Sequence, residues 1–219
     1  MSSVRVAIVD SGVNFAHPHL GVPPDGLSLV GGGLEDPAGH GTCVAALVHW
    51  IAPEAQLDAI KVLPRDLRVS SALLAQAIEA AVARGARIVN VSIGTTDGTH
   101  VDRLRTACEA ATRAGATVVA AALSGRTDML PAGLDGVVAV APAVPPLLLR
   151  EDASGWPRWT ASSVPRPAEG RWTNFRGPSF AAARVTGILA RLAAELDDAK
   201  LLCALSEIAS GVREAPWLT

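Results

Sequence analysis

The 219-residue sequence lacks tyrosine and has lysine only at Lys61 and Lys200, so arginine carries nearly all of the positive charge. We attribute this to a compositional bias without mechanistic meaning. Long apolar runs are missing too, and those present fall far short of the roughly 18 to 20 residues of a membrane span. The net charge of −2 provides no general attraction to nucleic acid or to an anionic membrane. The composition therefore predicts neither as a partner.

Cysteine is scarce. Cys43, Cys108 and Cys203 are odd in number and widely spaced, which favours reduced thiols over a disulfide framework or a zinc site. The chain begins almost directly with an apolar run at residues 4–9, which leaves no room for a signal peptide. We therefore expect a cytoplasmic protein with no signal peptide and no recognisable propeptide.

The residues that are present alternate between two kinds of segment. Hydrophobic residues make up 49% and charged residues 18%, which excludes a disordered chain of this length. Apolar β-branched runs without polar alternation predict strands covered on both faces, near 4–9, 57–62, 87–93, 116–122 and 136–141. Ala-rich stretches predict helices near 42–50, 70–84, 99–114, 179–196 and 198–210. The pattern favours an α/β fold in which helices cover both faces of a mainly parallel sheet.

Three short segments place an aspartate, a histidine and a serine beside small residues: Asp10 in VDSG, His40 in GHGT and Ser179 in GPSF. A serine hydroxyl needs an adjacent base to become a nucleophile, and a histidine base needs a buried carboxylate to hold its tautomer. Taken singly, the aspartate could cap a turn, the histidine could be structural, and the serine could be a helix N-cap. Together they predict an acyl-transfer site with Asp10 orienting, His40 as base and Ser179 as nucleophile.

The predicted fold also places these residues. Active sites of open parallel sheets lie beyond the carboxyl ends of the strands, and Asp10 lies where the first strand is expected to end. His40 and Ser179 both lie at predicted helix starts. At such a position the N–H of Ser179 and the positive end of the helix dipole would face a developing oxyanion.

These segments resemble one family. Residues 6–20 (VAIVDSGVNFAHPHL), 39–48 (GHGTCVAALV) and 177–190 (GPSFAAARVTGILA) are similar to the aspartate, histidine and serine segments of the subtilisin-like serine proteases, the subtilases of peptidase family S8. Residues 51–63 and 88–94 resemble that family's second and third core strands. The resemblance implies a three-layer subtilisin-like fold, one catalytic domain over residues 1–219, and a serine endopeptidase that forms an acyl-enzyme on Ser179.

The resemblance further implies where a peptide substrate lies. An extended peptide would add to strand edges, with backbone hydrogen bonds giving affinity and alternate side chains entering pockets. The lining residues are small or apolar, so a hydrophobic side chain is expected at P1, the substrate residue before the scissile bond. Asp128 or Asp135 on nearby loops could alter that preference. The implied lining residues are Ser92, Ile93 and Gly94 on one side and Ala120, Ala121 and Ala122 on the other.

Two positions depart from the family pattern. Ser124 stands where the family has its oxyanion asparagine, and a short hydroxyl donates less well; Asn90, Ser92 and Asn174 are alternative donors. His19 stands where the family commonly has an aspartate, and imidazole is a poor ligand for calcium. We therefore expect neither a metal nor a cofactor.

The segment 142–176 departs most. Its proline-rich sequence predicts an irregular loop with one strand at 147–150. Three tryptophans, Trp156, Trp159 and Trp172, either cap the core or form a surface for substrate or a protein partner.

Two classes of function remain open. The first is a serine endopeptidase, in one version dedicated to the maturation of a peptide or protein. The second is a catalytically impaired relative that binds peptides or regulates, in keeping with Ser124 and the altered 142–176 segment. Acyl transfer to an amine, giving ligation or macrocyclisation, is a variant of the first, because amines and water compete for the same acyl-enzyme.

Overall fold

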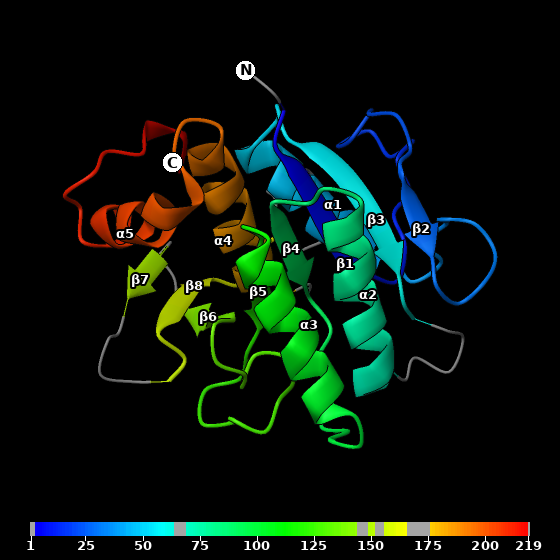
Figure 1. Ribbon diagram of the computed structural model, residues 1–219. Helices are drawn as coiled ribbons and strands as arrows, with labels where there is room; N and C mark the ends of the chain where they lie inside the picture. The colour runs from blue at the N-terminus through cyan, green and yellow to red at the C-terminus, as the bar shows by residue number, and fades with distance from the viewer. Residues whose placement is uncertain (1–2, 64–68, 144–148, 152–155, 166–175, 219) are drawn as a thin grey trace.

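One sheet organises the computed structural model (Figure 1), which describes residues 3–63, 69–143, 149–151, 156–165 and 176–218. Within these residues the sheet has eight strands in the order β2-β3-β1-β4-β5-β6-β8-β7. All neighbours pair in parallel except β7, which is antiparallel to β8 at one edge. The strands are β1 (Arg5–Asp10), β2 (Gly26–Ser28), β3 (Gln56–Lys61), β4 (Ile88–Val91), β5 (Thr117–Ala121), β6 (Val138–Ala143), β7 (Leu149–Glu151) and β8 (Trp159–Ser162).

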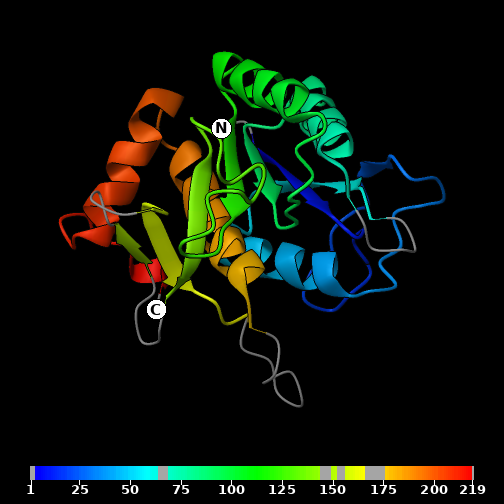
Figure 2. The same ribbon diagram turned by 90° about the horizontal axis from the view of Figure 1, so that it is seen from below.

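Helices cover both faces of this sheet. The helices α2 (Ser71–Ala83) and α3 (Val101–Arg113) lie on one face, and α1 (His40–Ile51) and α4 (Pro178–Ala193) on the other, as the view from below shows (Figure 2). The helix α5 (Asp198–Ala209) packs beside α4, and a 3₁₀ turn at Pro216–Leu218 follows. The predicted three-layer α/β fold is confirmed.

The strands have no polar face because each side chain meets one of two cores. In β1, Val6 and Ile8 belong to the core under α1 and α4, whereas Ala7 and Val9 belong to the core under α2 and α3. Successive side chains of a strand point to opposite faces, so both faces need apolar residues when both are covered. This explains the apolar runs without alternation in the sequence.

The helices α1 and α4 approach each other closely. A Cβ added to Gly187 of α4 would lie 2.8 Å from Cβ of Ile51 at the end of α1. The bare backbone of Gly187 therefore allows a contact that a side chain would prevent. Because His40 begins α1 and Ser179 lies in the first turn of α4, this contact fixes the relative position of two predicted site residues.

The segment 142–176 is more regular than we predicted. β6 extends into it, and its described part also contains β7 and β8. The predicted strand at 147–150 overlaps β7, although residues 147 and 148 lie outside the described residues. The short strands β2 and β8 were not predicted, because three or four residues show no period. The description of this segment as an irregular loop with one strand was therefore wrong.

Two of the three tryptophans in this segment pack inward. Trp159 lies on β8 with 3% of its surface exposed, and the partly buried Trp156 packs against the core under α2 and α3. Trp172 lies outside the described residues. The structure therefore favours core capping over a binding surface for Trp156 and Trp159. Among the helices of the described residues, none is long and apolar enough to cross a membrane.

Candidate active site

Asp10 and His40 meet at the carboxyl edge of the sheet. Asp10 is the last residue of β1, and its side chain is fully buried. The Nδ1 atom of His40 lies 2.7 Å from Oδ1 and 3.0 Å from Oδ2 of Asp10. A carboxylate only accepts hydrogen bonds, so this contact places the proton of a neutral imidazole on Nδ1 and leaves Nε2 as the basic nitrogen.

Glycines make this approach possible. Gly39 has a φ of 73°, in the left-handed region, where the chain turns into α1. Gly41 leaves no space for a side chain, because a Cβ there would lie 2.2 Å from the carbonyl oxygen of Gly12 and 2.9 Å from Cβ of Asp10. The small residues around His40 in the sequence therefore have a steric cause.

The pKa of His40 is raised above the ordinary histidine value of 6.5. Burial of the ring is the largest single influence and lowers the pKa. The hydrogen bond to Asp10, together with the negative charges of Asp10 and Asp36, outweighs that effect because each stabilises the imidazolium. A raised pKa makes the imidazole the stronger base.

A pH profile should report this shift. Only neutral His40 can accept a proton, so we expect kcat/KM to fall with decreasing pH through an apparent pKa above 6.5. In Asp36→Asn one negative charge is gone, and the acid limb should move to lower pH. The measurement is kcat/KM against pH for both proteins, with Asp102→Asn, at an exposed position of α3, as the control. An acid limb that stays in place in Asp36→Asn would contradict the electrostatic explanation.

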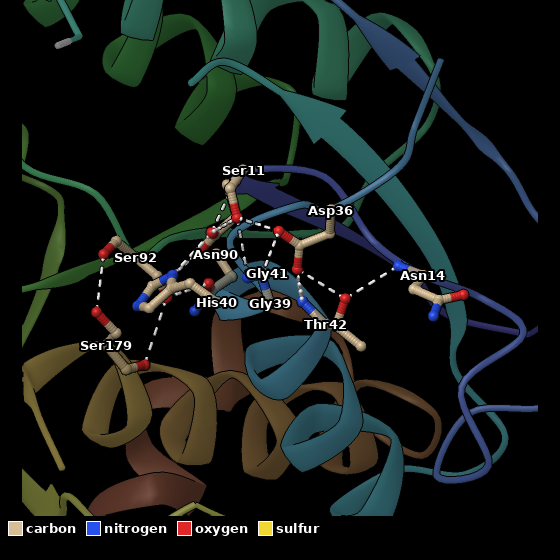
Figure 3. Close-up of polar contacts among 11 residues, drawn as sticks. Ser11, Asn14, Asp36, Gly39, His40, Gly41, Thr42, Asn90, Ser92 and Ser179 are labelled. Carbon is tan, nitrogen blue, oxygen red and sulfur yellow. Dashed lines mark hydrogen bonds and ion pairs between the residues drawn. The ribbon is translucent and has the colours of Figure 1, made fainter. Parts of the chain in front are cut away.

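Ser179 follows Pro178, the first residue of α4, and its hydroxyl donates a 2.9 Å hydrogen bond to the carbonyl oxygen of Ser92 (Figure 3). The ring of the next residue, Phe180, lies 6.1 Å from the ring of His40 between centroids. The start of α4 therefore lies near the imidazole. In the state described, the hydroxyl is held by Ser92, and a rotation about its Cα–Cβ bond would direct it to another acceptor.

A buried polar chain lies beneath Ser179. The amide nitrogen of Asn90 donates to Oγ1 of Thr186 at 2.9 Å, and the hydroxyl of Ser92 lies 2.7 Å from Oδ1 of Asn90. Asn90 is fully buried, and both side chains bond within the protein. These bonds argue against Asn90 or Ser92 as the oxyanion donor, because both side chains already have partners within the protein. Asn174 lies outside the described residues.

Ser124 lies in an exposed turn after β5. The neighbouring Leu123 is also exposed, and its carbonyl oxygen accepts the N–H of Arg126 to close the turn. Exposure leaves the hydroxyl of Ser124 able to point in several directions. Its role as an oxyanion donor remains a prediction.

Asp36 is a site residue that the sequence analysis missed. Its Oδ2 accepts from the backbone N–H of Thr42 at 2.8 Å and from the Thr42 hydroxyl at 2.7 Å, and its Oδ1 accepts from the N–H of Gly39 at 2.9 Å. Gly39, the N-cap residue, has no side chain for capping, so Asp36 satisfies the first turn of α1 in its place. In the sequence, an acidic residue just before a predicted helix start could have indicated this capping role.

Asp36 also connects to Asp10. The hydroxyl of Ser11 lies 2.7 Å from Oδ1 of Asp36 and 3.1 Å from Oδ1 of Asp10 (Figure 3). The backbone N–H of Ser11 donates to the same Asp10 oxygen at 2.7 Å. These bonds hold the Asp10 carboxylate in one orientation toward His40.

The two segments implied to bind substrate diverge at the same edge. β4 and β5 pair as far as Val91 and Ala120. Beyond that point, the N–H of Ala122 donates to the carbonyl oxygen of Val140 in β6, and Thr95 pairs with Leu130. The two chain segments that follow the strands therefore take different hydrogen-bond partners. The residues concerned are Ser92, Ile93 and Gly94 after β4, and Ala120, Ala121 and Ala122 at the end of β5.

Two carboxylates were considered as specificity determinants. Asp128 pairs with Arg126 at 2.7 and 2.9 Å, and the guanidinium lowers the pKa of this exposed carboxyl. Asp135 is exposed. The Arg126 pairing offsets the charge of Asp128 at the edge where substrate is expected.

The cysteines carry free thiols. Burial raises the pKa of Cys43, one turn after His40, and raises that of Cys108 to about 12. Cys43 packs against the core under α1 and α4, which favours a packing role over a second nucleophile. Among the residues that the structure describes, no group of three or more His, Cys, Asp or Glu side chains could hold a metal ion.

A mainly parallel sheet with an aspartate at the end of a central strand, and a histidine and a serine at the starts of two helices, is typical of an α/β protein of the subtilisin type. The chain belongs to the subtilase family, whose model matches residues 1–202. It is 37% identical over 153 residues to a thermostable alkaline protease of Halalkalibacterium halodurans, a match that covers 64% of this chain and 41% of that protein. The chain thus matches less than half the length of that relative.

Solved structures show the same fold. A lanthipeptide protease superimposes with a TM-score of 0.71 at 21% identity, over 90% of this chain and 78% of the other. The prenylagaramide maturation protease PagA superimposes with a TM-score of 0.64 at 26% identity, over 98% of this chain and 79% of the other.

Proposed function

We propose that the protein is a serine endopeptidase in which Asp10, His40 and Ser179 form a catalytic triad within a single catalytic domain. The observation that carries the proposal is the 2.7 Å contact between His40 and the buried Asp10, beside the helix start that bears Ser179. The order of the three residues along the chain is that of the subtilase segments. Family membership supports the assignment of a peptidase activity.

In the proposed reaction, the Ser179 hydroxyl leaves the Ser92 carbonyl and gives its proton to Nε2 of His40 as its oxygen attacks the scissile carbonyl carbon. Asp10 stabilises the imidazolium that forms. The imidazolium then protonates the leaving amine, and an acyl-enzyme remains on Ser179. Water, deprotonated by His40, hydrolyses this ester and restores the serine.

The oxyanion of each tetrahedral intermediate needs donors. The N–H of Ser179 lies in the first turn of α4, where N–H groups have no acceptor within the helix. This N–H and the helix dipole supply the first donor. Ser124 supplies the second in our proposal, and its exposure makes it a weak one.

We further propose a dedicated role in the maturation of a peptide or protein. Similarity to the prenylagaramide maturation protease PagA, at 26% identity, supports this role. We also propose a cytoplasmic location, which the free thiols of Cys43, Cys108 and Cys203 support. A catalytically impaired peptide-binding protein is the second candidate, and exposed Ser124 is the observation that favours it.

Labelling with a fluorophosphonate separates the two candidates. We expect one covalent adduct, mapped by mass spectrometry to Ser179, because the reagent phosphonylates a serine only where an adjacent base activates it. His40→Ala should lose the adduct while remaining folded. Folded native protein that stays unlabelled would overturn the endopeptidase proposal and leave the binding protein.

A further inference from the structure

A surface pocket of about 910 Å³ lies between the segment that follows β1 and the segment that precedes α1. The proposed reaction does not use this pocket. Its most buried lining residues, Val13 and Phe15, are 3% and 6% exposed. A pocket of this volume can hold several side chains of a ligand. The apolar part of the lining includes Val13, Phe15, Ala16, Val22, Pro24 and Leu34.

Hydrogen bonds connect the pocket to the triad. The backbone N–H of Asn14, a lining residue, donates to the Thr42 hydroxyl at 3.0 Å, and this hydroxyl donates to Asp36 at 2.7 Å. Asp36 lines the pocket too, and its charge acts on His40. Asn14 and Asp36 lie on the side of His40 away from Ser179 (Figure 3). The pocket is therefore close to the base and separate from the nucleophile.

Backbone contacts hold the two walls of the pocket together. The N–H of Val13 donates to the carbonyl oxygen of Leu34 at 2.8 Å. A Cβ added to Gly12 would lie 2.5 Å from the carbonyl oxygens of Leu34 and Glu35, so the two segments touch at this point. The carbonyl oxygen of Glu35 also accepts from Nζ of Lys61 at 2.6 Å. The pocket is thus formed before a ligand binds, which lowers the cost of ordering it on binding.

The lining of the pocket carries negative charge. Glu35 is exposed, and its carboxylate forms no ion pair within the described part of the chain. The Asp36 carboxylate accepts hydrogen bonds from Ser11, Gly39 and Thr42, and none of these donors is a cation. Among the lining residues that the structure describes, none is lysine, arginine or histidine. The pocket therefore complements an apolar segment that carries a basic residue.

We propose that this pocket is a second recognition site for the substrate, which binds an apolar segment bearing an arginine or a lysine at a distance from the scissile bond. The inference rests on the proposed endopeptidase function and adds to it a means of selecting one peptide among many. A peptide held at the triad already lies near the pocket. Its tethered segment is then present at a high effective concentration, so weak contacts in the pocket are enough to raise the affinity.

The test uses one cleavable peptide, extended at either end through a Gly-Ser linker by Leu-Leu-Arg-Leu, Leu-Leu-Glu-Leu or Ser-Ser-Arg-Ser. We expect the apolar basic extension to lower KM by about 10-fold at one of the two ends, because leucine side chains become buried. The value of kcat should stay within about twofold, since the pocket does not touch the reacting bond. The other two extensions should have smaller effects, because each lacks one of the two features.

Two variants of the pocket test its apolar part and its charge. Ala16→Trp fills the pocket from an exposed lining position, and should abolish the effect of the extension without changing KM for the unextended peptide. Glu35→Gln should reduce the preference for the arginine over the glutamate extension by about threefold at low ionic strength. The matched controls are Ala194→Trp and Glu54→Gln, at exposed positions beyond the ends of α4 and α1, and both should behave as the native protein.

Binding without turnover gives an independent readout. The Kd values of Ser179→Ala for the extended and unextended peptides should differ by the same factor as the KM values. Thermal unfolding checks that Ala16→Trp is folded. An active native protein that gains nothing from an extension at either end would overturn the role of the pocket and leave the endopeptidase function intact. The same holds if folded Ala16→Trp retains the native gain.

Two further outcomes are distinct. Self-association of the native protein that Ala16→Trp abolishes would show that a second copy of the chain covers the pocket, and would overturn its role in substrate binding. Absence of both turnover and Ser179 modification would overturn the proposed function. Pocket-dependent binding of the extended peptide by such an inactive protein would still support the pocket as a peptide site.

Discussion

His40→Ala is expected to lower kcat by about 10⁶-fold, and Ser179→Ala by a similar factor. Each variant removes one half of a single proton transfer, so the double variant should be no slower than either single one. Such non-additivity is the signature of residues that act as a unit. The measurement is kcat for a cleavable peptide, with active-site titration of the native protein as reference.

Asp10→Asn should have a smaller effect, about 10⁴-fold in kcat, because its amide can hold the imidazole in the wrong tautomer but cannot stabilise the imidazolium. His100→Ala is the control, since His100 is an exposed histidine at the start of α3. Near-native kcat in folded His40→Ala would refute the assignment of His40 as the base. Additive losses in the double variant would argue that His40 and Ser179 act separately.

Ser124→Asn is expected to raise kcat by about 100- to 1000-fold, the reverse of the loss seen when an oxyanion donor is removed. This factor corresponds to roughly 3 to 4 kcal/mol of transition-state stabilisation. An asparagine amide is longer than a serine hydroxyl and presents two donors on a planar group. KM should change little, because the oxyanion exists only after attack on the substrate.

Ser124→Ala provides the matched comparison. If the native hydroxyl donates weakly, its removal should lower kcat by less than the asparagine raises it. A labelled, active enzyme in which Ser124→Asn gives no increase would show that Ser124 is not the weak point of the site. The oxyanion would then depend on the N–H of Ser179 and on a donor other than Ser124.

The local motifs around Asp10, His40 and Ser179 could be identified from sequence because their chemistry is carried by adjacent residues. Small neighbours are required wherever backbone approaches backbone, as at Gly41 against Gly12. The apolar runs indicated where strands begin. The proline before Ser179 is compatible with a helix start. Both helix starts were confirmed within two residues.

Contacts between distant segments could not be predicted in the same way. Asp36 was missed because its partners, Ser11 and Thr42, become its neighbours only when the loop before α1 folds over the end of β1. The commitment of the Asn90 amide to Thr186 joins residues 96 positions apart. A side chain that looks available in sequence can therefore be fully bonded in the fold.

The sequence by itself determined the family, the layered α/β architecture and the identity of the three candidate triad residues, because each depends on local pattern and residue type. Tertiary structure alone decided which groups surround them: Asp36 as the cap of α1, and the Ser92 carbonyl that holds the Ser179 hydroxyl. These depend on how the ends of β1 and β4 and the starts of α1 and α4 are brought together. That arrangement is set by the packing of the whole sheet and its two helical layers.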